Sequence, residues 1–299
     1  MRKILLAMSI SLLTVACGKN DATAPGTAPG TSGDGRPQLL VTDDGVHIAY
    51  HEYGAGDDLV VLIHGWSCDS NYWRAQIDPL REKYHVVALD LAGHGASTRN
   101  RNDWSIRAFA GDVSAVAQRV GAKRMVLVGH SMGGPVAVEA AAMLGDRVIG
   151  VIGVDTLRNV GLPPPPAEQV AAQLKMLQED FIGTTRSFVS SQFFTKDADP
   201  ALAQKIALDM SLAPPEVAIP AIKGLNDWNA DGALAAMKQP LALINSDLGG
   251  VTDEARLREI HPQTRVVSLK DVGHFLMMEA PDRFNPILLA ELSRLFAGQ

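Results

Sequence analysis

The 299-residue sequence predicts an α/β fold with a mostly parallel, eight-stranded sheet covered by helices on both faces. Short apolar runs, typical of strands buried on both sides, alternate with longer stretches of helical periodicity. This alternation stops after residue 155 and resumes near residue 237, and only helical segments lie between. We therefore expect a helical cap over residues 156–236, inserted after the sixth strand, and a sheet domain built from residues 39–155 and 237–299.

The first half of the sheet domain is expected to contain six strands and three helices. Ile106, Phe109 and Val113 recur at helical spacing, and a turn at residues 42–45 separates the first two strands. The expected strands are Leu39–Val41, Val46–Glu52, Leu59–Ile63, Val86–Leu89, Met125–Val128 and Val148–Val154, and the expected helices are Asn71–Tyr84, Ser105–Val120 and a segment ending at Leu144.

The proline-rich stretch Gly161–Pro166 marks the change of pattern, because consecutive prolines fit neither a helix interior nor a sheet. Beyond it the cap is expected to contain helices at Ala167–Phe181, Leu202–Leu212 and Val217–Leu225. The sheet domain then resumes with strands at Leu241–Ile244 and Val266–Leu269 and helices at Ala255–Ile260 and Arg283–Phe296.

The N-terminus has the features of a targeting segment. Two basic residues precede the apolar run Ile4–Val15, which is too short to span a bilayer comfortably and leads to Ala16 and Cys17. This arrangement resembles the lipobox of bacterial lipoproteins, although Thr14 stands where leucine is usual. It implies a signal peptide over residues 1–16, a lipidated Cys17, a disordered tether over residues 17–38 and a membrane-anchored protein on the periplasmic side. The alternatives are secretion with cleavage near Ala16, or an uncleaved anchor.

Composition excludes several other classes of function. The formal net charge is −6, with no basic cluster of the kind that binds nucleic acid. Cys17 and Cys68 are the only cysteines in the sequence, and neither they nor the histidines have the spacing of metal ligands. Gly93-His94-Gly95 lacks the third glycine of a dinucleotide-binding loop, so we expect neither a cofactor nor a metal.

The pentapeptide Gly129–Gly133 carries a serine between an apolar strand and a run of small residues typical of a helix start. The G-x-S-x-G pattern in this setting is a nucleophile elbow, in which a strained turn exposes the serine hydroxyl above the sheet. Glycines on either side let strand and helix pass close together, and the helix N-terminus favours developing negative charge. The sequence thus predicts that Ser131 is a nucleophile.

From about Leu39 to its end the chain resembles the α/β-hydrolase family, in the subgroup with a helical cap. The resemblance places the general base at His274, in Gly273-His274-Phe275 after the last strand. It also implies that the backbone N–H groups of Trp66, after His64-Gly65, and of Met132 form the oxyanion hole. His64 is expected to brace its loop, and His130 to serve packing.

Three aspartates compete for the acid that orients His274. The family usually places this acid where Asp247 lies, although Asn245-Ser246 replaces the usual preceding glycine. Asp155 ends the preceding strand, a position that some members of the family use, and Asp253 is expected to cap a helix. We assign the acid to Asp247 and keep Asp155 and Asp253 as alternatives, because geometry and not spacing defines a triad.

These residues predict a serine hydrolase that cleaves carboxylic esters of small to medium, apolar substrates through an acyl-enzyme. The same triad serves lactones, amides, carbon–carbon bonds or perhydrolysis, and a binding protein on a hydrolase scaffold is the alternative of another class. The expected partners are a small-molecule ester and, through the N-terminal lipid, a membrane. The sequence does not indicate an oligomeric state.

Overall fold

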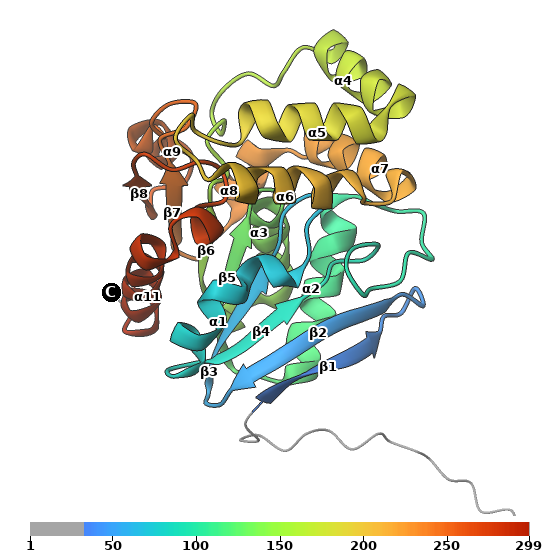
Figure 1. The fold of residues 1–299 in the computed structure, drawn as a ribbon. Coiled ribbons are helices and arrows are strands. Elements are labelled where there is room, and N and C mark those ends of the chain that lie inside the picture. The colour runs from blue at the N-terminus through green and yellow to red at the C-terminus, as the bar shows by residue number, and fades with distance from the viewer. Residues whose placement is uncertain (1–32, 299) are drawn as a thin grey trace, which may run out of the picture.

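The computed structural model describes residues 33–298. Its centre is a single eight-stranded sheet (Figure 1). The strand order is β1-β2-β4-β3-β5-β6-β7-β8. Strands β1 and β2 form an antiparallel hairpin at one edge, β2 is antiparallel to β4, and all other neighbours are parallel. The strands are β1 Gly33–Val41, β2 His47–Gly54, β3 Asp58–Ile63, β4 His85–Leu89, β5 Arg124–His130, β6 Val148–Val154, β7 Leu241–Ser246 and β8 Thr264–Leu269.

Helices cover both faces of this sheet. Helices α2 and α3 pack together on one face, and α1 and α11 pack together on the other (Figure 1). Ser105 caps the start of α2 by accepting a hydrogen bond from the Ala108 amide at 3.2 Å. The helices of the sheet domain are α1 Arg74–Arg81, α2 Ile106–Val120, α3 Gly133–Leu144, α9 Glu254–Ile260, α10 Leu276–Glu279 and α11 Pro281–Phe296, with short 3-10 turns at Ser70–Trp73 and Gly145–Arg147.

The cap consists of helices between β6 and β7, and in Figure 1 α4 to α7 lie above the sheet domain. These helices are α4 Ala167–Glu179, α5 Phe181–Gln192, α6 Pro200–Ser211, α7 Pro215–Asp227 and α8 Ala230–Ala236. The sequence analysis missed α5 and α8. Helix α5 is rich in glycine, serine and threonine, which have low helix propensity. Asp180 has a non-helical backbone that separates α4 from α5, and it caps α5 by accepting a hydrogen bond from the Gly183 amide.

The fold class expected from the sequence is confirmed, but the first strand begins earlier than expected. Residues 33–38, assigned to the tether, belong to β1 and pair with β2. Residues 33–38 lack the alternating apolar pattern by which a strand is recognised in a sequence. An edge strand can form without that pattern, because backbone hydrogen bonds to its neighbour hold it in place. The signal peptide and Cys17 lie outside the described residues and remain predictions. Within residues 33–298, no helix has the length and apolar character needed to cross a membrane.

Candidate active site

Ser131 occupies a strained turn between β5 and α3. Its φ of 52° is in the left-handed region that side chains other than glycine rarely adopt. A Cβ atom at Gly129 would lie 2.1 Å from the carbonyl oxygen of Gly133, and one at Gly133 would lie 2.5 Å from that of Ile63. Only glycine fits these two positions, and this close approach produces the sharp corner that presents Ser131 at the carboxyl edge of the sheet.

The base expected from the sequence, His274, pairs with Asp155 and not with Asp247. The His274 Nδ1–H group donates a hydrogen bond of 2.6 Å to Asp155 Oδ2. Since Nδ1 is occupied by this hydrogen bond, Nε2 is the ring nitrogen that can accept a proton. Among the described residues, Ser131 Oγ makes no hydrogen bond with His274.

Asp155 is held as an ionised, buried carboxylate. Its side chain is 4% exposed, and its Oδ1 atom accepts hydrogen bonds from the Ser246 amide at 2.7 Å and from Arg158. Burial alone would raise the pKa of Asp155, but the hydrogen bond from His274, the electrostatic interaction with that ring and the charge of Arg158 lower it below its usual value. Asp155 is therefore ionised at neutral pH and suited to stabilise a protonated imidazole.

The assignment of the acid to Asp247 is corrected by this geometry. Asp247 follows β7, and its Oδ1 atom accepts a hydrogen bond from the backbone amide of Asp271 at 3.0 Å. It thereby ties the end of β7 to the loop that precedes His274. Asp253 caps α9, as expected, by accepting a hydrogen bond from the Arg256 amide at 3.1 Å.

Arg158 is a site residue that the sequence analysis missed. It binds Asp155 and donates to Ser246 Oγ at 2.8 Å and to the carbonyl oxygens of Leu248 and Gly250. One guanidinium thus joins the acid after β6 to the loop after β7. The local sequence signal for this contact is an arginine three residues after the aspartate that follows β6.

The loop after β3 brings Trp66, which is expected to contribute to an oxyanion hole, close to Ser131. A Cβ atom at Gly65 would lie 3.1 Å from Ser131 Cβ, so the Gly65-Trp66 backbone passes directly next to the serine. Trp66 Nε1 donates to the carbonyl oxygen of Ala218 in α7 at 2.7 Å, which links this loop to the cap. Met132 is the N-cap residue directly before α3, at the helix N-terminus, where amide groups lack acceptors within the helix.

His64 has the bracing geometry expected for it. Its Nδ1–H group donates to the carbonyl oxygen of Gly65 at 2.8 Å, and its Nε2 atom accepts from the Leu91 amide at 3.0 Å. Burial lowers the pKa of His64, so the ring is neutral and both of its nitrogen atoms are occupied by backbone groups. His64 therefore fixes the loop that carries Gly65 and Trp66.

A cavity of about 570 Å³ between the sheet domain and the cap contains Ser131 and His274. Its volume is in the range of small-molecule sites. Most of its wall is apolar and comes from both parts of the fold. The apolar lining residues are Trp66, Met176, Leu177, Phe188, Phe193, Met210, Ile222, Leu225 and Phe275.

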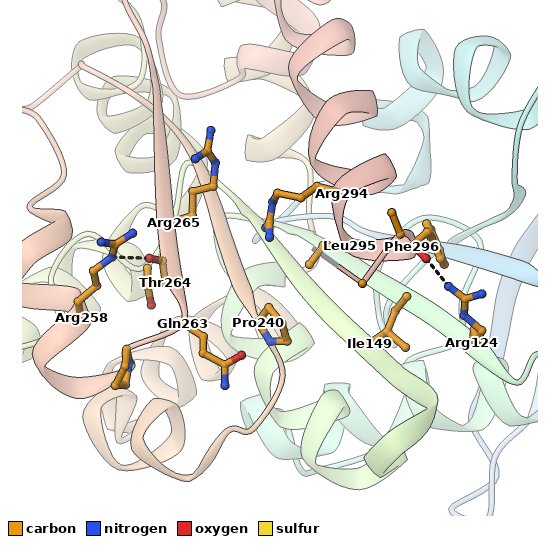
Figure 2. Close-up of a pocket in the computed structure, with 13 residues that line it drawn as sticks. Arg124, Ile149, Pro240, Arg258, Gln263, Thr264, Arg265, Arg294, Leu295 and Phe296 are labelled. Atoms are coloured by element: carbon orange, nitrogen blue, oxygen red, sulfur yellow. Dashed lines mark hydrogen bonds between the residues drawn. The ribbon is translucent and has the colours of Figure 1, made fainter.

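A second cleft, of about 740 Å³, lies at the opposite edge of the sheet, near the amino ends of the parallel strands (Figure 2). Its arginines are engaged with the protein: Arg124 donates to the Phe296 carbonyl oxygen and Arg258 to that of Thr264. Open α/β sheets bind ligands at their carboxyl ends, which favours the cavity at Ser131 as the functional site. Within residues 33–298, no three His, Cys, Asp or Glu side chains are grouped to hold a metal ion.

Comparison with known proteins fits this geometry. Residues 60–287 match the model of the alpha/beta hydrolase family. The chain belongs to this family. Over 253 residues it is 27% identical to the pimeloyl-[acyl-carrier protein] methyl ester esterase of Yersinia pseudotuberculosis, covering 80% of this chain and 95% of the esterase.

Two further similarities are informative. Over 108 residues the chain is 39% identical to the dihydrolipoyllysine-residue acetyltransferase component of the acetoin cleaving system of Cupriavidus necator, a match covering 36% of this chain but only 29% of that protein. The solved structure of Est816, described as an N-acyl homoserine lactone degrading enzyme, aligns with a TM-score of 0.74 and 27% identity. That alignment covers 85% of this chain and 99% of Est816.

Proposed function

We propose that this protein is a serine hydrolase that cleaves carboxylic esters through an acyl-enzyme on Ser131. The observation that carries the proposal is the 2.6 Å hydrogen bond between His274 and Asp155 in a site where His274 and the elbow serine line one cavity. A serine hydroxyl is a weak nucleophile at neutral pH, and an oriented imidazole with a free Nε2 supplies the base that it needs.

The proposed reaction has two acyl-transfer steps. His274 Nε2 takes the proton of Ser131 as Oγ bonds to the ester carbonyl carbon, and the N–H groups of Trp66 and Met132 bind the resulting oxyanion. The intermediate collapses, the bond to the alcohol oxygen breaks, and His274 returns the proton to the leaving alcohol. Water then attacks the acyl-enzyme with His274 again as base, which releases the acid and regenerates Ser131. Asp155 stabilises the imidazolium in both steps.

The apolar wall of the cavity supports an acyl group that is itself apolar and of small to medium size. Relatives named as an esterase and as a lactone-degrading enzyme make linear esters and lactones the first substrates to compare. A lactone is a cyclic ester, so both substrates use the same bond chemistry and differ in whether the leaving alcohol remains attached.

The test combines turnover with covalent labelling of the full-length protein. We expect hydrolysis of nitrophenyl esters in a series from acetate to dodecanoate, with acylated homoserine lactones measured in parallel. A phosphonofluoridate that reacts with activated serines should add one label per chain, located at Ser131 by peptide mass spectrometry. Ser131→Ala is the control and should take up no label. Labelling at another residue, or neither turnover nor labelling, would contradict the proposal and favour a binding protein.

The charge of Arg158 should lower the pH at which the Asp155–His274 pair binds a proton and activity is lost. Asp155 has a lowered pKa, so it stays ionised until the pH falls through that lowered value. Replacing Arg158 with Met removes a cation that lowers this pKa and leaves the burial that raises it. Because Arg158 lies beside the hydrogen-bonded Asp155–His274 pair, loss of its charge also makes it easier for the pair as a whole to bind a proton. We therefore expect the acidic limb of the pH profile of kcat/KM to move to higher pH. Arg107→Met, at an exposed position of α2, should leave the profile in place, and an unmoved limb in Arg158→Met would refute the effect.

A further inference from the structure

The backbone of the His274 loop is held at three successive amides and one carbonyl. The His274 amide donates to the carbonyl oxygen of Phe193 in the cap at 2.7 Å. The Gly273 and Phe275 amides, on either side, donate to the two carboxylate oxygens of Glu279, each at 3.0 Å. The His274 carbonyl oxygen accepts a hydrogen bond of 2.9 Å from His130 Nε2.

His130 therefore does more than pack against the elbow. Burial, with the neighbouring His274 as a second cause, lowers the pKa of His130 to about 3, so its ring is neutral at physiological pH. The carbonyl of His274 is an acceptor only, which places the His130 proton on Nε2.

Glu279 binds both amides with a single side chain. It is the last residue of the short helix α10, and its carboxylate folds back over the turn that carries His274. A Cβ atom at Gly273 would lie 2.4 Å from the Phe193 carbonyl oxygen and 2.7 and 2.8 Å from the carboxylate oxygens of Glu279. Residue 273 must be glycine for the turn to close this tightly around the carboxylate.

We propose that Glu279 is a positioning residue for the catalytic histidine, acting by fixing the backbone on both sides of His274. The ring of His274 must hold Nδ1 at 2.6 Å from Asp155 while Nε2 faces the cavity. The Gly273 and Phe275 amides both donate to one carboxylate, and these two hydrogen bonds restrain the peptide groups that determine the direction of the ring. Misplacement of a catalytic group by about 1 Å costs on the order of 100-fold in rate. This inference rests on the proposed function, because it assigns Glu279 to the same reaction.

The decisive variant is Glu279→Gln in the full-length protein. The amide side chain keeps one acceptor oxygen and turns an NH₂ group toward the second backbone N–H, so one of the two hydrogen bonds is lost. We expect kcat on the best ester of the series to fall about 10- to 100-fold while KM changes little. Labelling of Ser131 by the phosphonofluoridate should slow by a similar factor, because it depends on the same base.

Glu291→Gln is the matched control, since Glu291 is a buried carboxylate in α11 that binds Arg265 and Arg294 and takes no part in the site. It should leave kcat unchanged. Glu279→Asp retains the negative charge but shortens the side chain, so it should lose kcat as Glu279→Gln does. This second variant also decides the question if Glu279→Gln does not fold.

Three results would overturn the inference. An unchanged kcat in Glu279→Gln, with active and labelled wild-type protein, would reject the positioning role and leave the proposed function intact. Full activity in Glu279→Asp would show that kcat depends on the negative charge at residue 279 and not on hydrogen bonds to both amides. Inactive and unlabelled wild-type protein would reject the proposed function, and this inference with it.

Discussion

Asp155→Asn should reduce kcat for ester hydrolysis by about four orders of magnitude, whereas Asp247→Asn should change it by less than about tenfold. The first substitution would offer His274 Nδ1 a neutral amide group that no longer stabilises the imidazolium and that favours the wrong tautomer of the ring. The side chain of Asp247 hydrogen-bonds only the Asp271 amide among the described residues, so its replacement perturbs a loop and leaves the hydrogen bond of the base unchanged.

The two variants control for each other, because both replace an aspartate at the carboxyl edge of the sheet with its amide. Steady-state kinetics on one nitrophenyl ester gives kcat, and thermal unfolding gives Tm. A variant with a lower kcat and an unchanged Tm has lost catalysis and kept its fold. Equal losses of kcat would show that the loop around His274 is the shared cause. A large loss confined to Asp247→Asn would restore the assignment made from the sequence and reject the pairing of His274 with Asp155.

The sequence specified the sheet domain well because its signals are local. A buried parallel strand such as β3 is a continuous apolar run, and the elbow at Ser131 requires glycines at fixed positions on either side. His274 was assigned through the family resemblance, which expects the base in the loop after the last strand, and the structure places it in the loop after β8. The strand and elbow inferences, by contrast, need only neighbouring residues.

The carboxylate that pairs with His274 could not be assigned in this way, because the choice between Asp155 and Asp247 depends on distances between segments far apart in the chain. Strands β6 and β7 are neighbours, and both Asp155 and Asp247 follow their ends. Asp155 is selected by contacts with the Ser246 amide, 91 residues away, and with His274, 119 residues away. The contact between the Phe193 carbonyl oxygen and the His274 amide could not be predicted for the same reason. Phe193 lies at the end of α5, a helix that the sequence patterns did not indicate.

Gly129→Ala should destabilise the protein by at least about 3 kcal/mol and abolish most of the ester hydrolysis. The added Cβ atom would meet Gly133 O at 2.1 Å and Gly134 N at 2.7 Å, and all of these atoms belong to the backbone. No side-chain rotation can relieve the contact, so either β5 or the start of α3 must move. The move displaces Ser131 and also Thr156 Oγ1, which donates to the Ser131 carbonyl oxygen at 2.7 Å.

Gly111→Ala is the matched control for this prediction. Gly111 lies inside α2, and a Cβ atom built there meets nothing within 4 Å, so alanine should stabilise the protein by about 0.5–1 kcal/mol through its higher helix propensity. Urea denaturation gives both free energies of unfolding, and the same preparations give kcat. If Gly129→Ala were as stable and as active as Gly111→Ala, the strand and helix could not approach as closely as the elbow geometry requires. The strained presentation of Ser131 would then have to arise from elsewhere in the turn.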